Sequence, residues 1–260
     1  MKAETSGPGP TPAEPTRTPE PPVAGVDSGA SGFLARLGVA LDPALLELAL
    51  THRSWAYENG GVAHNERLEF LGDSVLGLAV TARLFRDQPE ASEGDLARRR
   101  SALVSTSALA EVARRIGLGE HLRLGRGEEL TGGRAKQSIL ADTVEALIGA
   151  VFQDRGPAEA EAFVLRLVGP LFEEADRFWA AMDPKTALQE VAAASGLPAP
   201  VYEVVGSGPD HNRTFTATVR VGTHAGTGTG ASKKAAEVAA ALDAWTIVTG
   251  AAATGVAGTR

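Results

Sequence analysis

Two groups of acidic residues have the types and spacing needed to bind a metal ion. Glu66, Glu69 and Asp73 follow one another at intervals of three and four residues, and Asp142 and Glu145 are three residues apart. On α-helices, these intervals place the carboxylates of each group on one face. Hard oxygen ligands at this density suit Mg²⁺ or Mn²⁺. A solvated acidic face paired with arginines is the alternative.

The helices that would carry these carboxylates are apolar. Leucine and valine residues surround the first group, and Asp142 and Glu145 are the only charges between Lys136 and Asp154. Burial and neighbouring like charges both raise the pKa of a carboxyl group. The groups must therefore be protonated, paired with Arg or Lys, or bound to a divalent cation.

The sequence lacks the residues that several other kinds of catalytic or metal site require. A di-iron carboxylate bundle needs a histidine three positions after a glutamate, and none of the five histidines has a glutamate three positions before it. The Gly-x-Ser-x-Gly elbow of serine hydrolases and the Gly-Lys-Ser/Thr end of a P-loop are also missing. The sequence contains no cysteine, which excludes disulfides, thiolate zinc sites, iron–sulfur clusters and a cysteine nucleophile.

A second candidate site lies near the C-terminus and is basic. Lys233 and Lys234 stand in the first turn of a predicted helix, where the helix dipole favours acidic residues, and helix N-terminal amides with lysines fit phosphate. Gln189 and Glu190 on an earlier helix and His211 in a Gly/Pro turn add polar contact points. Double-stranded RNA is read by spaced contacts of this kind. Solvated lysines and an ordinary turn are the alternative.

The hydrophobic pattern divides the 260 residues into two folded regions and two tails. Residues 1–30 are rich in proline and residues 251–260 in small residues, so we expect both tails to be disordered. Residues 31–182 have helical periodicity, and residues 183–250 read as a helix, three strands and a helix. The predicted helices are 43–50, 65–85, 92–101, 105–116, 137–153, 158–168, 171–181, 184–195 and 232–245, and the predicted strands are 201–205, 214–221 and the weak, Gly-rich 224–230.

The two regions together resemble the ribonuclease III family. Residues 65–74 (Asn-Glu-Arg-Leu-Glu-Phe-Leu-Gly-Asp-Ser) are similar to the family signature, and residues 138–150 to its second acidic motif. Residues 51–54 (Thr-His-Arg-Ser) and 93–95 (Glu-Gly-Asp) resemble further family segments. Residues 183–245 are similar to a double-stranded-RNA-binding domain. The layout is that of the small bacterial enzyme, without the helicase or second nuclease domain of Dicer-like relatives.

The resemblance implies a multidomain protein. An all-α ribonuclease III endonuclease domain would cover residues 31–156, with helices continuing to 182, and an α+β (α-β-β-β-α) double-stranded-RNA-binding domain would cover 183–250. It implies a homodimer through the helical domain that hydrolyses double-stranded RNA to 5′-phosphate and 3′-hydroxyl ends. It also implies processing of ribosomal RNA precursors and some messenger and transfer RNA transcripts in the cytoplasm. A non-catalytic dimeric double-stranded-RNA-binding regulator is the alternative.

The resemblance also assigns residues by motif position. Glu69, Asp73, Asp142 and Glu145 would be metal ligands for Mg²⁺, with Mn²⁺ as a substitute. Asp73 and Glu145 would be the catalytic pair, and Glu66 a supporting catalytic residue nearer to substrate or dimer contacts. The RNA-binding residues that it implies are Gln189, Glu190, His211, Lys233 and Lys234.

The charge balance fits this assignment. Lys and Arg number 25 and Asp and Glu 32, for a net charge of −7, which argues against a simple basic coat protein. Residues 31–182 carry 17 basic and 22 acidic residues, so the five candidate carboxylates equal the acidic surplus of that region. Bound divalent ions would offset this surplus. The sequence has no membrane-spanning run and no apolar signal-peptide core.

Overall fold

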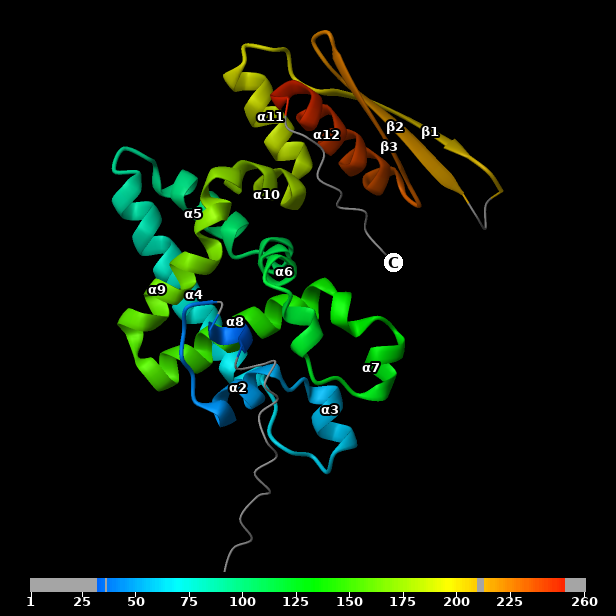
Figure 1. Ribbon diagram of the computed structural model, residues 1–260. Helices are drawn as coiled ribbons and strands as arrows, with labels where there is room; N and C mark the ends of the chain where they lie inside the picture. The colour runs from blue at the N-terminus through cyan, green and yellow to red at the C-terminus, as the bar shows by residue number, and fades with distance from the viewer. Residues whose placement is uncertain (1–31, 36, 210–212, 251–260) are drawn as a thin grey trace, which may run out of the picture.

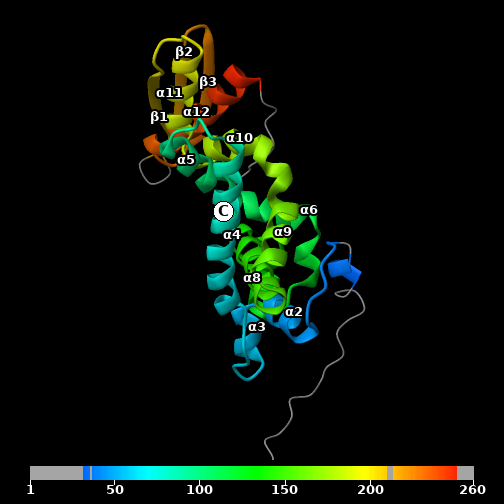
Figure 2. The same ribbon diagram turned by 90° about the vertical axis from the view of Figure 1, so that its left-hand side faces the viewer.

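The computed structural model describes residues 32–35, 37–209 and 213–250, so both predicted tails lie outside the described residues. Figure 1 shows a helical domain and a smaller module with a three-stranded sheet. Figures 1 and 2 both place this module at the end of the helical domain where α5 (Glu93–Leu103) and α10 (Ala175–Met182) lie. The predicted fold class, an all-α domain followed by an α+β domain, is confirmed. Among the described residues, no helix is long and apolar enough to cross a membrane.

Most of the predicted helices are present, with ends that differ by a few residues. Besides α5 and α10, the helical domain contains α2 (Pro43–Leu50), α3 (Arg53–Glu58), α4 (Glu66–Asp87), α6 (Thr106–Arg115), α7 (Arg126–Leu130), α8 (Gln137–Arg155) and α9 (Pro157–Val168). Three short 3₁₀ helices span Leu118–His121, Gly133–Ala135 and Gly169–Glu174. The last of these replaces the start of the predicted helix 171–181. It contains Pro170, which has no N–H to donate to a helical hydrogen bond.

Side-chain caps fix several of the boundaries that the sequence predicted. Ser92 accepts a hydrogen bond from the backbone N–H of Asp95 (3.2 Å) and begins α5. Gly117, with a φ of 70°, follows α6 in the left-handed region that glycine tolerates best. Local polar and glycine residues therefore set these helix ends, as the capping preferences predict.

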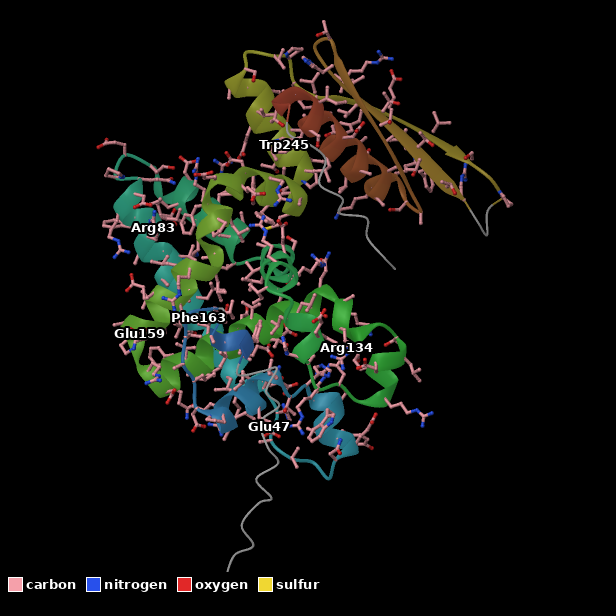
Figure 3. The ribbon with its side chains drawn as sticks, viewed as in Figure 1. Glu47, Arg83, Arg134, Glu159, Phe163 and Trp245 are labelled. Carbon is pink, nitrogen blue, oxygen red and sulfur yellow. The ribbon has the colours of Figure 1, made fainter. Side chains whose placement is uncertain are left out.

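The centre of the helical domain is α8, whose side chains are almost all buried between Ile139 and Val151. Helix α4 crosses α8, and α2, α6 and α9 pack around the pair. Phe163 of α9 is fully buried in this core, whereas Trp245 of α12 (Lys233–Thr249) belongs to the separate core of the C-terminal module (Figure 3).

The module forms an antiparallel sheet with the order β1 (Val201–Ser207), β2 (Thr214–Val221) and β3 (His224–Gly230). Helices α11 (Pro184–Ala194) and α12 pack together, and α12 covers β2 and β3. The weak third strand is confirmed, and its glycines have a packing reason. A Cβ on Gly226 would lie 2.4 Å from the backbone nitrogen of Ala244, and one on Gly228 would lie 2.3 Å from that of Ala240.

Candidate active site and RNA-binding surface

The candidate active site lies where α4 crosses α8, and two glycines permit this crossing. A Cβ on Gly72 would lie 1.8 Å from the carbonyl oxygen of Glu145, and one on Gly149 would lie 2.1 Å from that of Leu68. Real side chains do not tolerate such distances, so the helix backbones touch at these two points. The crossing brings the acidic faces of the two helices together.

Three of the predicted carboxylates meet at this crossing. Oxygen atoms of Glu69, Asp142 and Glu145 lie within 4.8 Å of one another. Asp73, one turn further along α4, lies outside this group of three but is close enough to act electrostatically on Glu145. Glu66 stands apart from them and pairs with Arg53 at 3.4 Å.

Burial and mutual repulsion of the carboxylates dominate the electrostatics of this cluster, although Arg53 partly offsets them at Glu69 and Asp142. Burial, reinforced by Asp73, Asp142 and Glu69, raises the pKa of Glu145 to about 8. Burial also raises the pKa of Glu69 and of Asp142. In the described part of the chain, no Lys, Arg or His forms an ion pair with any of these four carboxylates. The arginine-paired acidic face is therefore not what the structure shows, and the donor set fits a divalent cation.

A cavity of about 470 Å³ opens beside Glu69 and Asp142. Basic and polar side chains join the carboxylates in its wall, which is lined by His52, Arg53, Asn65, Glu66, Glu69, Glu128, Lys136, Ser138, Ile139 and Asp142. The sequence motifs gave no role to His52, Glu128, Lys136 or Ser138. The only signal for His52 was its place in the segment 51–54, which resembles a family segment.

Two local interactions organise this wall. His52 is the N-cap of α3, and its Nδ1 accepts a hydrogen bond from the backbone N–H of Ser54 at 3.2 Å. Burial lowers the pKa of the His52 imidazole, which favours its neutral form. Lys136 contacts the Glu128 carboxylate and donates a hydrogen bond to Thr131 Oγ1 at 2.9 Å. The contact with Lys136 lowers the pKa of Glu128.

The predicted RNA-binding residues that the structure describes lie on the C-terminal module. Lys233 and Lys234 are exposed in the first turn of α12, and neither has an ion-pair partner among the residues that the structure describes. Gln189 is exposed on α11. Glu190, its neighbour, instead accepts hydrogen bonds from the Arg98 guanidinium (2.8 Å) and from Trp179 Nε1 (3.1 Å). His211 lies outside the described residues.

Comparison with known proteins agrees with both parts of this architecture. The family model described as "Ribonuclease-III-like" matches residues 42–171, and that of the "Double-stranded RNA binding motif" matches residues 184–248. The chain is 64% identical over 226 residues to "Ribonuclease 3" of Leifsonia xyli subsp. xyli, a match that covers 86% of this chain and 95% of the relative. The chain belongs to the ribonuclease III family.

Further relatives support the same assignment. "Ribonuclease 3" of Thermobifida fusca is 59% identical over 214 residues, with 82% of this chain and 89% of the relative covered. A crystal structure of the nuclease domain of ribonuclease III from Campylobacter jejuni covers 56% of this chain and 97% of its own, with 38% identity and a TM-score of 0.53. As a ribonuclease III, the chain is an endoribonuclease of double-stranded RNA. The non-catalytic regulator is not favoured.

Proposed function

We propose that this ribonuclease III hydrolyses phosphodiester bonds in double-stranded RNA with a divalent metal ion held by Glu69, Asp73, Asp142 and Glu145. The observation that carries this proposal is the convergence of three carboxylates within 4.8 Å, none of which forms an ion pair with a basic residue in the described part of the chain. Residues 31–156, with helices to 182, would form the catalytic domain, and residues 183–250 would bind RNA. The products would be 5′-phosphate and 3′-hydroxyl ends.

The carboxylates divide the work by position. A bound Mg²⁺, or Mn²⁺ in its place, would supply an activated water and neutralise charge on the phosphate. Glu145 is the most buried of the proposed metal ligands and Asp73 is exposed, and we assign these two as the catalytic pair because they match the family's motif positions. Glu66, held by Arg53 at the cavity, would support catalysis by orienting the RNA strand that enters there.

The C-terminal module would hold the duplex. Lys233 and Lys234 form the start of α12 and present two positive charges to an RNA phosphate. Gln189, Glu190 and His211 would add contacts to the minor grooves. Glu190 has to leave Arg98 and Trp179 before it can make such a contact.

We infer that two copies pair through α4, because one face of this helix is apolar and uncovered. Phe70, Leu78 and Phe85 are 80%, 72% and 71% exposed, and their spacing places them along one side of the helix. In a related ribonuclease III structure from Campylobacter jejuni, 39% identical with a TM-score of 0.51, a structurally flexible region of the nuclease domain is involved in dimer formation. A twofold dimer would present one active site to each strand of a duplex.

The family resemblance supports a biological role. We propose that the enzyme acts in the cytoplasm on ribosomal RNA precursors and on some messenger and transfer RNA transcripts. Their base-paired stems would be the duplexes that it cleaves.

Incubation with a long RNA duplex, in Mg²⁺ or in chelator, tests the catalytic proposal. The wild-type protein should shorten the duplex only in the presence of metal, and Glu145→Gln should bind the duplex but not cleave it. Glu159→Gln is the matched control, because Glu159 is an exposed carboxylate on α9, a helix that carries none of the proposed site residues (Figure 3). Cleavage in chelator, or normal cleavage by Glu145→Gln, would contradict the assignment. Binding without cleavage by the wild type would favour the regulator.

A further inference from the structure

The imidazole of His52 is held in one tautomer by its own helix turn. The backbone N–H of Ser54 donates to His52 Nδ1 at 3.2 Å, and Ser54 Oγ lies 2.8 Å from the same nitrogen. The backbone N–H of Gly125 donates to Ser54 Oγ at 2.9 Å, which fixes the serine hydroxyl beside the ring. Because Nδ1 accepts a hydrogen bond from the Ser54 N–H, the ring proton resides on Nε2.

The side chain of His52 is part of the wall of the cavity beside the carboxylate cluster. His52 lines this cavity together with Glu69 and Asp142, and within the described ranges its Nε2 has no hydrogen-bond partner. The backbone holds the residue in place, because His52 N donates to the Arg123 carbonyl at 3.1 Å. A fixed, neutral N–H donor is therefore available to a ligand in the cavity.

We propose that His52 donates this hydrogen bond to a ribose 2′-hydroxyl of the RNA strand and thereby helps to select RNA over DNA. The proposal rests on the proposed function, since it requires the substrate strand to lie in this cavity. A 2′-hydroxyl both accepts and donates hydrogen bonds, and the cavity offers it a donor in His52 and acceptors in the carboxylates of Glu66 and Glu128.

A phosphate oxygen fits this position less well than a hydroxyl. It only accepts hydrogen bonds, and the neighbouring carboxylates would repel its charge. The same cavity wall contains the cations Arg53 and Lys136, which are better partners for phosphate. The neutral donor is thus matched to the neutral group of the RNA backbone.

The capping role of His52 allows a variant that separates structure from recognition. Asparagine is a strong N-cap residue, so His52→Asn keeps an acceptor for the Ser54 N–H while its shorter side chain does not reach the position of Nε2. Ser92→Asn is the matched control, because it introduces the same N-cap residue at the exposed start of α5. Both variants should unfold within a few degrees of the wild type.

The test measures kcat/KM on RNA duplexes that carry a single 2′-deoxy nucleotide at successive positions around the cleaved bond. For the wild type, a 2′-deoxy nucleotide at one of these positions should lower kcat/KM about tenfold. This is the effect of one hydrogen bond at the upper end of the usual range. The kcat/KM of His52→Asn on the all-ribose duplex should be about tenfold below that of the wild type. A 2′-deoxy nucleotide at the same position should not lower it further, since the substitution and the deoxy nucleotide remove the same interaction. Ser92→Asn should behave as the wild type.

Three outcomes overturn the proposal: full activity of His52→Asn, an undiminished 2′-deoxy penalty in that variant at every position, or a proton on Nδ1 in ¹⁵N spectra of the wild-type ring. The undiminished penalty would assign His52 to a phosphate oxygen instead. Each of these results leaves metal-dependent cleavage by the wild type intact. Failure of the proposed function would instead appear as a wild type that does not cleave, or that cleaves in chelator.

Discussion

A Cβ atom on Gly72 of α4 would lie 1.8 Å from the carbonyl oxygen of Glu145 on α8. Only glycine allows the two helix backbones to approach this closely. Glu69 belongs to the same turn of α4 as Gly72, and Asp142 to the turn of α8 that precedes Glu145. The packing of the domain and the geometry of the carboxylate cluster therefore both depend on this contact.

Gly72→Ala should impair both properties. The added methyl group meets backbone atoms that cannot rotate away, so we expect the free energy of unfolding to fall by about 3 kcal/mol or more. Because α4 and α8 must separate, metal-dependent cleavage should fall as well. Thermal unfolding and duplex cleavage measure the two effects. Gly94→Ala is the control, since a Cβ there meets its nearest atom at 3.8 Å. Wild-type stability in Gly72→Ala would contradict the packing argument.

The sequence predicted the carboxylates because their spacing is local. The positions of Glu69, Asp142 and Glu145 follow from helical periodicity within two long helices. The rest of the cavity wall could not be predicted in this way, because His52 caps a helix of six residues and Glu128 lies in a helix of five, both too short to show a period. Contacts between distant segments hold these helices in place, such as the hydrogen bond from Gly125 N to Ser54 Oγ.

The glycines of the third strand could not be explained from the sequence either, because their reason lies in a contact with another element. These glycines weaken a strand prediction, since glycine has a low β propensity. The structure explains them by the close contact of Gly226 and Gly228 with α12. This reason depends on a helix that follows the strand in the sequence, so no pattern within the strand itself contains it.

The raised pKa of Glu145 predicts a pH-dependent stability in chelator. The pKa of Glu145 in the folded state, about 8, exceeds the ordinary value of 4.5. At pH values between these two, the folded state therefore binds more protons than the unfolded state. This contribution to stability is fully present below pH 4.5 and is lost as the pH rises through about 8. Glu145→Gln should remove it, so the melting temperature of the variant should fall less between pH 5 and 8, about the interval between the two pKa values. Parallel curves for the two proteins would contradict the shift.

Bound metal should restore the stability that the wild type loses at high pH. A divalent cation competes with protons for the same carboxylates, so Mg²⁺ should raise the melting temperature more at about pH 8 than at about pH 6. Glu145→Gln should respond less, because it offers one charged ligand fewer. An equal response at both pH values would argue against metal binding at these carboxylates.

The contact between Arg98 and Glu190 predicts a competition with RNA. Arg98→Ala removes the 2.8 Å ion pair that holds Glu190 against the helical domain. Partly exposed ion pairs contribute little, so RNA affinity should rise by about two- to fivefold. Arg100→Ala, on the exposed side of the same helix, is the control. Titration with a labelled duplex in chelator measures the RNA affinity of both variants. Weaker binding by Arg98→Ala would show that Arg98 itself contacts RNA.

The apolar face of α4 predicts the oligomeric state. Leu78→Lys places a charge in the middle of the exposed row between Phe70 and Phe85, and burying this charge in an interface would be costly. Sedimentation should show a dimer for the wild type and a monomer for the variant at micromolar concentration. Val205→Lys, which changes another exposed apolar residue on β1, should remain dimeric. A dimeric Leu78→Lys protein would place the interface elsewhere.

The two lysines at the start of α12 predict the salt dependence of RNA binding. Each lysine that neutralises a phosphate adds about 0.7 to 0.9 to the slope of log K against log salt. Lys233→Ala combined with Lys234→Ala should therefore weaken binding and lower this slope by about 1.5. Arg166→Ala, an exposed cation on α9, should leave the slope unchanged. Affinity that falls in the lysine variant without a change of slope would mean that these side chains stabilise the module rather than contact phosphate.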